Sequence, residues 1–353
     1  MKKFFVKTKK LFYLLMIVGQ LVVLTGCLNS VKETKPMGMM YFSFFDTVSN
    51  IYSYAGDSQE KFNENCEEVA SILEEYHKLF DIYHEYSGVN NLCTINKNAG
   101  GEAIVVDEKL IEFLLYTKEM YTLTNGKANV MLGAVLKLWH NAREYASNDP
   151  MNAKIPDIVL LEEAIKHTSI DLLEIDEENN TVRITDPSAL IDVGAIGKGY
   201  ATEKAAQHLE QKGITSYVLN IGGNIRIIGT KVNGDGWNTG IKNPLDPSSY
   251  AFYTNIADTS CVTSGDYERY FIADGKKYHH IIDGETLMPA NYFSSITIIT
   301  KDSGLADTLS TALFCMNYED GLKLVESLGN VEVLWIYSDG SQKTTDGMIS
   351  IKQ

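Results

Sequence analysis

A carboxylate and a hydroxyl four residues apart, Asp307 and Thr311, are the first side chains in this sequence that suggest chemistry. They lie in a stretch with helical character, and a helix brings residues i and i+4 to one face. Both offer hard oxygen ligands of the kind that Mg²⁺ accepts, usually together with waters and phosphate oxygens. A side-chain hydrogen bond within the helix would use the same spacing, so the pair by itself leaves both interpretations open.

A glycine-rich segment, DVGAIGKGYA at residues 192–201, leads into a run of good helix formers. Glycines let backbone N–H groups approach a ligand closely, and the start of a helix carries partial positive charge. With Lys198 as a point charge, the segment suggests a phosphate site. It matches neither the G-x-x-x-x-G-K-[ST] loop nor the dinucleotide fingerprint. A plain helix entry with glycines for close packing explains it equally well.

Two adjacent histidines, His279 and His280, follow the segment TSGDYERYF at 263–271. Neighbouring residues of a strand point to opposite faces, so the two histidines cannot both face one site or chelate one metal. One of them could act as a general base, and a surface or hydrogen-bonded core histidine is the alternative. The segment NIGGNIR at 220–226 predicts a bulge or tight turn between strands, which is either structural or close to a ligand.

The elements that must position these residues alternate between strands and helices. Helices are expected at 60–86, 109–124, 160–167, 305–316 and 321–328. Strands are expected at 42–54, 181–184, 217–221, 225–228, 331–337 and through most of 251–300, with a hairpin signal, Asn-Gly-Asp-Gly, within 232–241. Strand pairs joined by tight turns, with helices clustered between them, favour an α+β fold over a doubly wound α/β fold.

Composition excludes several classes of protein. The chain has 353 residues and a net charge of −15, with 44% hydrophobic and 22% charged residues. A chain of this composition is not disordered, and its length allows one large domain or two. The acidic balance excludes nucleic-acid binding through counterion release. Only one strongly apolar run is present, which excludes a multi-spanning membrane protein.

The N-terminal segment predicts export and lipid anchoring. The first 26 residues hold five lysines and no acid, and their apolar run at 11–24 is followed by Thr-Gly and then Cys27. This is the organisation of a secretory signal peptide, and its end resembles the lipobox of bacterial lipoproteins. We therefore expect a signal peptide at 1–26, a lipidated Cys27 with a flexible tether at 27–40, and a folded domain at 41–353 on the extracytoplasmic face of the cell membrane. An uncleaved anchor is the alternative.

Four further cysteines leave their redox state open. Export permits disulfides, but the spacings fit no metal motif, and connectivity cannot be deduced from sequence. Buried or free thiols are the alternative. The cysteines are Cys66, Cys93, Cys261 and Cys315.

Taken together, five segments resemble, in order, the motifs of the ApbE family of FAD:protein FMN transferases: DVGAIGKGYA, NIGGNIR, TSGDYERYF, DGKKYHHIID and ADTLSTALF. The resemblance covers nearly all of the domain at 41–353. It implies an α+β fold of the T-fold type, with antiparallel strands, clustered helices and FAD held in a cleft. It also implies Mg²⁺-dependent transfer of the FMN half of FAD to a Thr or Ser hydroxyl of an acceptor protein, with release of AMP.

Residue by residue, the resemblance implies three sets of side chains. The metal ligands would be Asp307, Thr311 and the backbone oxygen of Ala195. His280 would take the proton from the acceptor hydroxyl, with Asp307 as the second catalytic residue. Contacts with FAD would come from Phe45, Tyr83, Lys127, Ala128, Asn129, Asp192, Lys198 and Ile281 or Ile282.

The sequence departs from the family pattern near the expected FAD site. Asn129 and Met131 stand where the family commonly has Asp and Thr, and Asp283-Gly284-Glu285 replaces its usual D-P-x. Two other functions stay open: an FAD pyrophosphatase that gives FMN and AMP, and a flavin-binding lipoprotein without catalysis. The expected partners are FAD, an acceptor flavoprotein and the membrane through the lipid anchor, and no nucleic acid.

Overall fold

The computed structural model describes residues 36–350, so the predicted signal peptide, Cys27 and most of the predicted tether lie outside the described range. Strand β1 (Met37–Phe44) begins four residues before the domain boundary that we expected. Residues 37–40 therefore belong to a sheet and not to the tether. Within 36–350, no helix is both long enough and apolar enough to cross a membrane.

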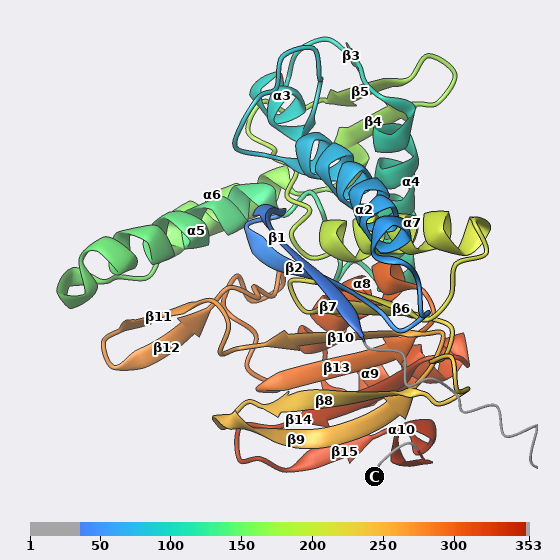
Figure 1. Ribbon diagram of the computed structural model, residues 1–353. Coiled ribbons are helices and arrows are strands. Elements are labelled where there is room, and N and C mark those ends of the chain that lie inside the picture. The colour runs from blue at the N-terminus through green and yellow to red at the C-terminus, as the bar shows by residue number, and fades with distance from the viewer. Residues whose placement is uncertain (1–35, 351–353) are drawn as a thin grey trace, which may run out of the picture. The chain divides into compact units, whose positions relative to one another are not determined.

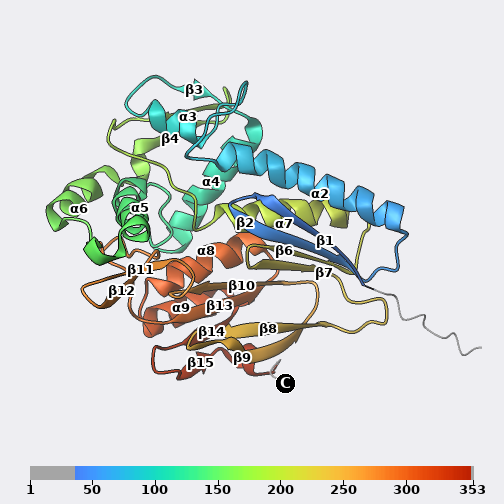
Figure 2. The same cartoon turned by 60° about the vertical axis from the view of Figure 1, so that its left-hand side comes forward.

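An eight-stranded sheet is the central element (Figures 1 and 2). Its strands are, in spatial order, β1, β2 (Thr47–Ser53), β6 (Tyr217–Ile221), β7 (Asn224–Ile228), β10 (Ser260–Gly265), β13 (Ser295–Thr300), β14 (Glu332–Ile336) and β15 (Gln342–Thr344). All neighbouring pairs are antiparallel. With helices inserted between the strand pairs, this topology confirms the predicted α+β class.

Helices cover one face of this sheet. Helix α8 (Ser303–Phe314) packs on β10 and β13, and α7 (Gly197–Gln211) packs on α8, on β7 and on α2 (Gln59–Phe80). The layer between α8 and the sheet is apolar, with Ile296 and Ile298 of β13 against Leu309 and Leu313 of α8. Helices α4 (Glu108–Leu123) and α9 (Tyr318–Leu328) complete the helical side.

A β-hairpin covers the opposite face. Strands β8 (Trp237–Asn243) and β9 (Asp246–Ile256) pair with each other and form a two-stranded sheet of their own. In β10, Cys261 packs with Ile241 and Phe252 of this hairpin, whereas its neighbour Val262 packs in the core with α8. This alternation is the period of two that a strand buried on both faces requires.

The remaining elements frame the upper part of Figure 1 and its left-hand side. They are α3 (Leu92–Lys97), a three-stranded sheet of β3 (Ile104–Val105), β5 (Thr181–Ile184) and β4 (Leu173–Asp176), helices α5 (Gly133–Asn148) and α6 (Ile158–Ala164), and a hairpin of β11 (Tyr270–Ala273) and β12 (Lys276–His279). The last described element, α10 (Asp346–Ser350), follows β15. In both views α5 lies beside the β11–β12 hairpin.

Three of the predicted elements differ from the structure. The strand expected at 42–54 is a hairpin, because Phe45 and Asp46 have positive φ angles of 52° and 51° and turn the chain. Helix α2 ends at Phe80 and not at residue 86, because the Asp81 carboxylate accepts the N–H groups of Tyr83 and His84 and holds a turn. The turn at 232–235 does not form the predicted hairpin, since β7 and β8 lie in different sheets.

Two further features were not predicted or were left open. Helix α5 has no counterpart among the predicted elements. All four cysteines of the described range, Cys66, Cys93, Cys261 and Cys315, are free and buried. The thiol alternative therefore holds for these residues in this structure.

Candidate functional site

The contact between α7 and α8 places Asp307 against the start of α7. The Asp307 side chain is buried, and its Oδ2 accepts the backbone N–H of Gly199 at 2.8 Å. Lys198 Nζ lies 3.7 Å from the same oxygen. A Cβ atom on residue 199 would lie 2.3 Å from the Ser303 carbonyl oxygen, so only glycine permits this close approach.

The charge on Asp307 is only partly compensated. Burial raises the pKa of the Asp307 carboxyl, while Lys198 and the Gly199 N–H act in the opposite direction. The side chain of Asn224, on β7, also hydrogen-bonds this carboxylate. The Asn224 Oδ1 atom is buried and has no hydrogen-bond partner within 36–350. A cation beside Asp307 would satisfy both the carboxylate and this oxygen.

These groups fit Mg²⁺. Thr311 follows Asp307 by one helical turn on α8 and is partly exposed, and Ala195 lies in the turn before α7. The described part of the chain contains no group of three or more His, Cys, Asp or Glu side chains that could hold a metal. Mg²⁺ needs no such group, because one carboxylate, waters and substrate phosphates commonly complete its shell.

The two histidines differ in their contacts. β12 ends at His279, so His280 is not part of the strand, and the expectation that the two side chains point to opposite strand faces stays a prediction. His279 ends β12 and is buried; its Nε2 donates to the Ala290 carbonyl at 2.7 Å, and its Nδ1 accepts the N–H of Ile281. His280 has no such partners, and its Nδ1 is buried and unpaired within the described range. Burial and nearby cations, Arg269 first among them, lower the pKa of His280 to about 3. The His280 ring is therefore neutral and can accept a proton.

Asp192 belongs to the same electrostatic environment as His280. Its Oδ1 accepts the Gly194 N–H at 2.9 Å, and its own N–H donates to the Val130 carbonyl at 2.8 Å. Burial raises the pKa of the Asp192 carboxyl, opposed first by the Gly194 N–H and then by the side chains of His140, Arg143 and Arg269.

Two aromatic side chains lie at the border of this region. The Tyr83 ring is 56% exposed and lies 5.7 Å from the His140 ring, and burial of its hydroxyl followed by the charge of Asp192 raises the pKa of Tyr83. Phe45 lies at the tip of the β1–β2 turn, where its N–H donates to His77 Nδ1 at 3.3 Å. Exposed or half-buried rings of this kind are available to stack on a planar ligand.

The other predicted FAD contacts are occupied by contacts within the protein. Lys127 Nζ binds Asp283 Oδ1 at 3.1 Å and Glu285 Oε1 at 2.9 Å. The Asn129 amide donates to the Thr168 carbonyl, and its oxygen accepts the N–H of Met131. Ala128 and Ile281 are buried in the core beneath α8, and Ile282 is buried in a second cluster.

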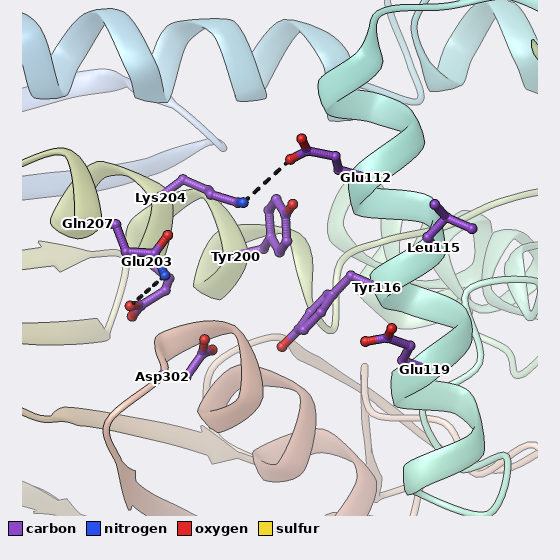
Figure 3. A pocket seen from close by; sticks show the side chains of 9 residues that line it. All are labelled: Glu112, Leu115, Tyr116, Glu119, Tyr200, Glu203, Lys204, Gln207 and Asp302. Atoms are coloured by element: carbon purple, nitrogen blue, oxygen red, sulfur yellow. Dashed lines mark hydrogen bonds and ion pairs between the residues drawn. The ribbon is translucent and has the colours of Figure 1, made fainter. Parts of the chain in front are cut away.

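Two cavities lie apart from Asp307, Lys198 and His280. The first, of about 310 Å³, lies between α4, α7 and the start of α8 (Figure 3). In Figure 3, Lys204 points toward Glu112 across the Tyr200 ring. The second, of about 510 Å³, is lined by residues of β8, of the β11–β12 hairpin and of the segment before β11, including Lys242, Ile272 and Tyr267. Neither cavity corresponds to the flavin cleft that the resemblance implies.

Three polar residues of this region were not predicted. Arg143 lies on α5, a helix that the predicted elements lack, and Arg269 precedes β11. Asn224, the first residue of β7, lies in a segment that was predicted to be a turn close to a ligand or a structural one. The sequence contains four arginines, Arg143, Arg183, Arg226 and Arg269. The small number of arginines in an acidic chain is the one sequence signal that could have pointed to Arg143 and Arg269.

The chain is similar to known proteins in sequence and in structure. The model of the ApbE family matches residues 45–335. The FAD:protein FMN transferase of Treponema pallidum is 30% identical over 321 residues, which are 86% of this chain and 85% of the relative. The enzyme of the same name from Vibrio cholerae is 31% identical over 286 residues, 79% of this chain and 80% of the relative.

Solved structures of similar proteins share the fold. The crystal structure of the ApbE protein of Thermotoga maritima superposes with a TM-score of 0.78 at 29% identity, covering 90% of this chain and 100% of that one. The flavin transferase ApbE of Vibrio cholerae superposes with a TM-score of 0.74 at 26% identity, covering 90% and 99%.

Proposed function

Because the chain belongs to the ApbE family, we propose that it is a transferase that moves the FMN part of FAD to a Thr or Ser hydroxyl of an acceptor protein and releases AMP. One observation carries the proposal in this molecule. A buried carboxylate, Asp307, lies against a lysine and the start of a helix, and a neutral histidine with a free ring nitrogen belongs to the same charged region.

The reaction needs a proton acceptor and a well-placed phosphate. The acceptor hydroxyl oxygen forms a bond with the phosphorus on the FMN side of FAD. The bond from that phosphorus to the bridging oxygen breaks, and AMP leaves with the electron pair. The hydroxyl proton passes to His280, whose ring is neutral because burial and nearby cations lower its pKa to about 3. A base this weak contributes modestly, so positioning and charge stabilisation do most of the catalysis.

Lys198 and the start of α7 would hold the pyrophosphate, since a helix N-terminus and a lysine are complementary to phosphate charge. Asp307, Thr311 and the Ala195 carbonyl would hold Mg²⁺, which supplies charge neutralisation for the phosphate oxygens and the departing AMP. Asp192, three residues before Ala195, lies in the charged surroundings of Arg143 and Arg269. The exposed ring of Tyr83 and that of Phe45 would contact the planar parts of FAD.

A single assay separates the candidate functions. The full-length chain is incubated with FAD, Mg²⁺ and an acceptor domain, and the products are analysed by mass spectrometry and flavin fluorescence in gels. Covalent flavin on the acceptor supports the transferase. Free FMN and AMP without labelling would instead establish the pyrophosphatase, and tightly bound but intact FAD would establish a binding protein.

Replacing Asp307 tests the metal site. We expect Asp307→Asn to lower the transfer rate at least about 100-fold, because the neutral amide removes the one carboxylate that would hold Mg²⁺. The exposed Asp320→Asn on α9 is the matched control and should retain the wild-type rate. If Asp307→Asn keeps the wild-type rate and its Mg²⁺ dependence, the metal assignment is wrong.

We also propose that Cys27 carries a lipid that anchors the protein to the extracytoplasmic face of the cell membrane. The proposal is supported by the lysines at the N-terminus, by the apolar run that follows them and by the small residues before Cys27. Cys27→Ala should abolish incorporation of a labelled fatty acid, whereas Cys66→Ala should not. Undiminished incorporation into the Cys27 variant would refute the anchor.

A further inference from the structure

Two of the four arginines of this chain have carboxylate partners and two do not. Arg226 is fully buried, with Nε 3.0 Å from Glu203 and Nη2 2.8 Å from Glu210. Arg183 lies 3.6 Å from Glu174. For Arg143 and Arg269, no carboxylate of residues 36–350 comes within 4.0 Å of the guanidinium group. Arg143 is partly buried and Arg269 is exposed, so both guanidinium groups are accessible to an anion.

Arg143 and Arg269 influence the same side chains although they lie far apart in the sequence. Both act electrostatically on His280, on Asp192 and on Tyr83. They also act on each other: burial, and then the charge of Arg269, lowers the pKa of Arg143. Like charges brought together without an anion between them cost free energy, which a bound anion would recover.

The packing of α5 holds Arg143 in this position. Trp139, one helical turn before Arg143, packs against Phe271 and Tyr278 of the β11–β12 hairpin, and its Nε1 donates to the Leu287 carbonyl at 2.9 Å. Arg143 Nη2 lies 3.0 Å from His140 Nδ1, on the same helix. The hairpin that receives Trp139 begins directly after Arg269 and ends directly before His280.

We propose that Arg143 and Arg269 together bind the pyrophosphate of FAD and so hold the phosphorus under attack beside His280. This inference rests on the proposed function. Guanidinium groups suit this task because their planar N–H donors match two phosphate oxygens at once. Lys198, on α7, also acts electrostatically on His280, so the acidic protein would present cations to the pyrophosphate from α7 as well as from the two arginines.

The test measures binding without turnover. In EDTA, flavin fluorescence gives the Kd of FAD, and competition gives the inhibition constants of inorganic pyrophosphate and of riboflavin, which has no phosphate. We expect Arg143→Gln and Arg269→Gln each to weaken the binding of FAD and of pyrophosphate by about tenfold or more. The inhibition constant of riboflavin should change by less than about twofold. Arg143→Lys, which keeps the charge, should restore part of the affinity for pyrophosphate.

Arg183→Gln is the matched control, and none of its three constants should change. Circular dichroism and the thermal midpoint show whether each variant is folded. Unchanged affinity of both Gln variants for pyrophosphate would overturn the inference. An equally large loss of affinity for riboflavin would also overturn it, because that result would place the arginines against the ring system of the flavin. Because no transfer is measured, a wild-type protein that binds pyrophosphate through Arg143 but never labels an acceptor would contradict the proposed function alone.

Discussion

At the scale of single residues, the candidate site is marked by polar side chains that are buried without a full set of hydrogen-bond partners. Asp307 is buried and contacts the Gly199 N–H, the Asn224 side chain and Lys198 at 3.7 Å, but Asn224 Oδ1 and His280 Nδ1 are buried without a partner within the described residues. His279, the neighbour of His280, has both ring nitrogens engaged. Buried polar groups are normally satisfied, so the unsatisfied ones indicate where a ligand completes the structure.

The protonation of His280 predicts an unusual pH profile. An ordinary histidine with a pKa near 6.5 would lose its basic form as the pH falls through that value. In His280 the pKa is lowered to about 3, so the neutral form persists throughout the range from pH 8 to pH 5. We expect kcat/KM for FAD to show no acid limb near pH 6.5 that depends on His280.

The measurement compares the pH profiles of the wild type, Arg269→Gln and His208→Gln. Removing the Arg269 charge should raise the pKa of His280 and shift any acid limb to higher pH, since a nearby cation disfavours the imidazolium. His208, which pairs with Glu68 at 2.7 Å, is the control and should not affect the profile. A wild-type limb at about pH 6.5 that is absent from His280→Gln would refute the prediction.

At the scale of elements, the site depends on how closely α7 approaches α8. The glycine at residue 199 lets the two backbones meet, and the same contact brings Lys198 to Asp307. As residue patterns, the predicted phosphate site and the predicted metal pair were separate, and only the family resemblance joined them through Ala195. The helix contact brings Lys198 within 3.7 Å of Asp307.

Replacing this glycine should separate the two helices. In Gly199→Ala, the added Cβ would lie 2.3 Å from the Ser303 carbonyl and 2.4 Å from Asp307 Cβ, so backbone must shift. We expect a loss of about 1–3 kcal/mol in the free energy of unfolding, together with weaker Mg²⁺-dependent activity. Urea unfolding and transfer assays on the same sample check both.

Gly321→Ala on α9 is the control for this substitution. Its Cβ would meet Leu313 Cδ2 at 3.3 Å, a flexible side-chain end, and alanine is the better helix former. The free energy of unfolding should change by less than about 1 kcal/mol. If the two substitutions change the free energy of unfolding and the activity equally, the site does not depend on the close approach of the α7 and α8 backbones at residue 199.

At the scale of the whole molecule, a buried ionic network ties the sheet to the helices that carry the site. Arg226 of β7 binds Glu203 of α7, and the same Glu203 oxygen accepts the N–H of Ser303 at the start of α8 at 2.9 Å. The exposed fraction of the Arg226 side chain is zero. A buried pair of this kind gives little net stability, but losing one partner leaves a buried charge.

We therefore expect Arg226→Met to lower the free energy of unfolding by about 3–5 kcal/mol, as measured by urea unfolding. The double variant Arg226→Met/Glu203→Gln should recover part of the loss, because it removes the unpaired carboxylate as well. Arg183→Gln breaks a half-exposed pair and should cost less than about 1 kcal/mol. A double variant no more stable than Arg226→Met would contradict this explanation.

Sequence alone determined the fold class and the main chemical groups. Alternation in strands and periodicity in α2, α4 and α8 are local signals, because each element must bury one face. The pair Asp307 and Thr311 and the segment around Lys198 also follow from spacing within one element, whereas only the family resemblance distinguished His280 from His279. These are properties that a few neighbouring residues decide.

Only the tertiary structure decided which distant groups meet. Arg143 and Arg269 are 126 positions apart in the numbering, and packing of α5 on the β11–β12 hairpin brings their charges to the same histidine. Lys127 likewise contacts the distant residues Asp283 and Glu285, so a lysine that the family resemblance assigned to FAD has partners within the protein. Long-range packing has no local signature, since it is set by complementary surfaces of elements that are separate in the chain.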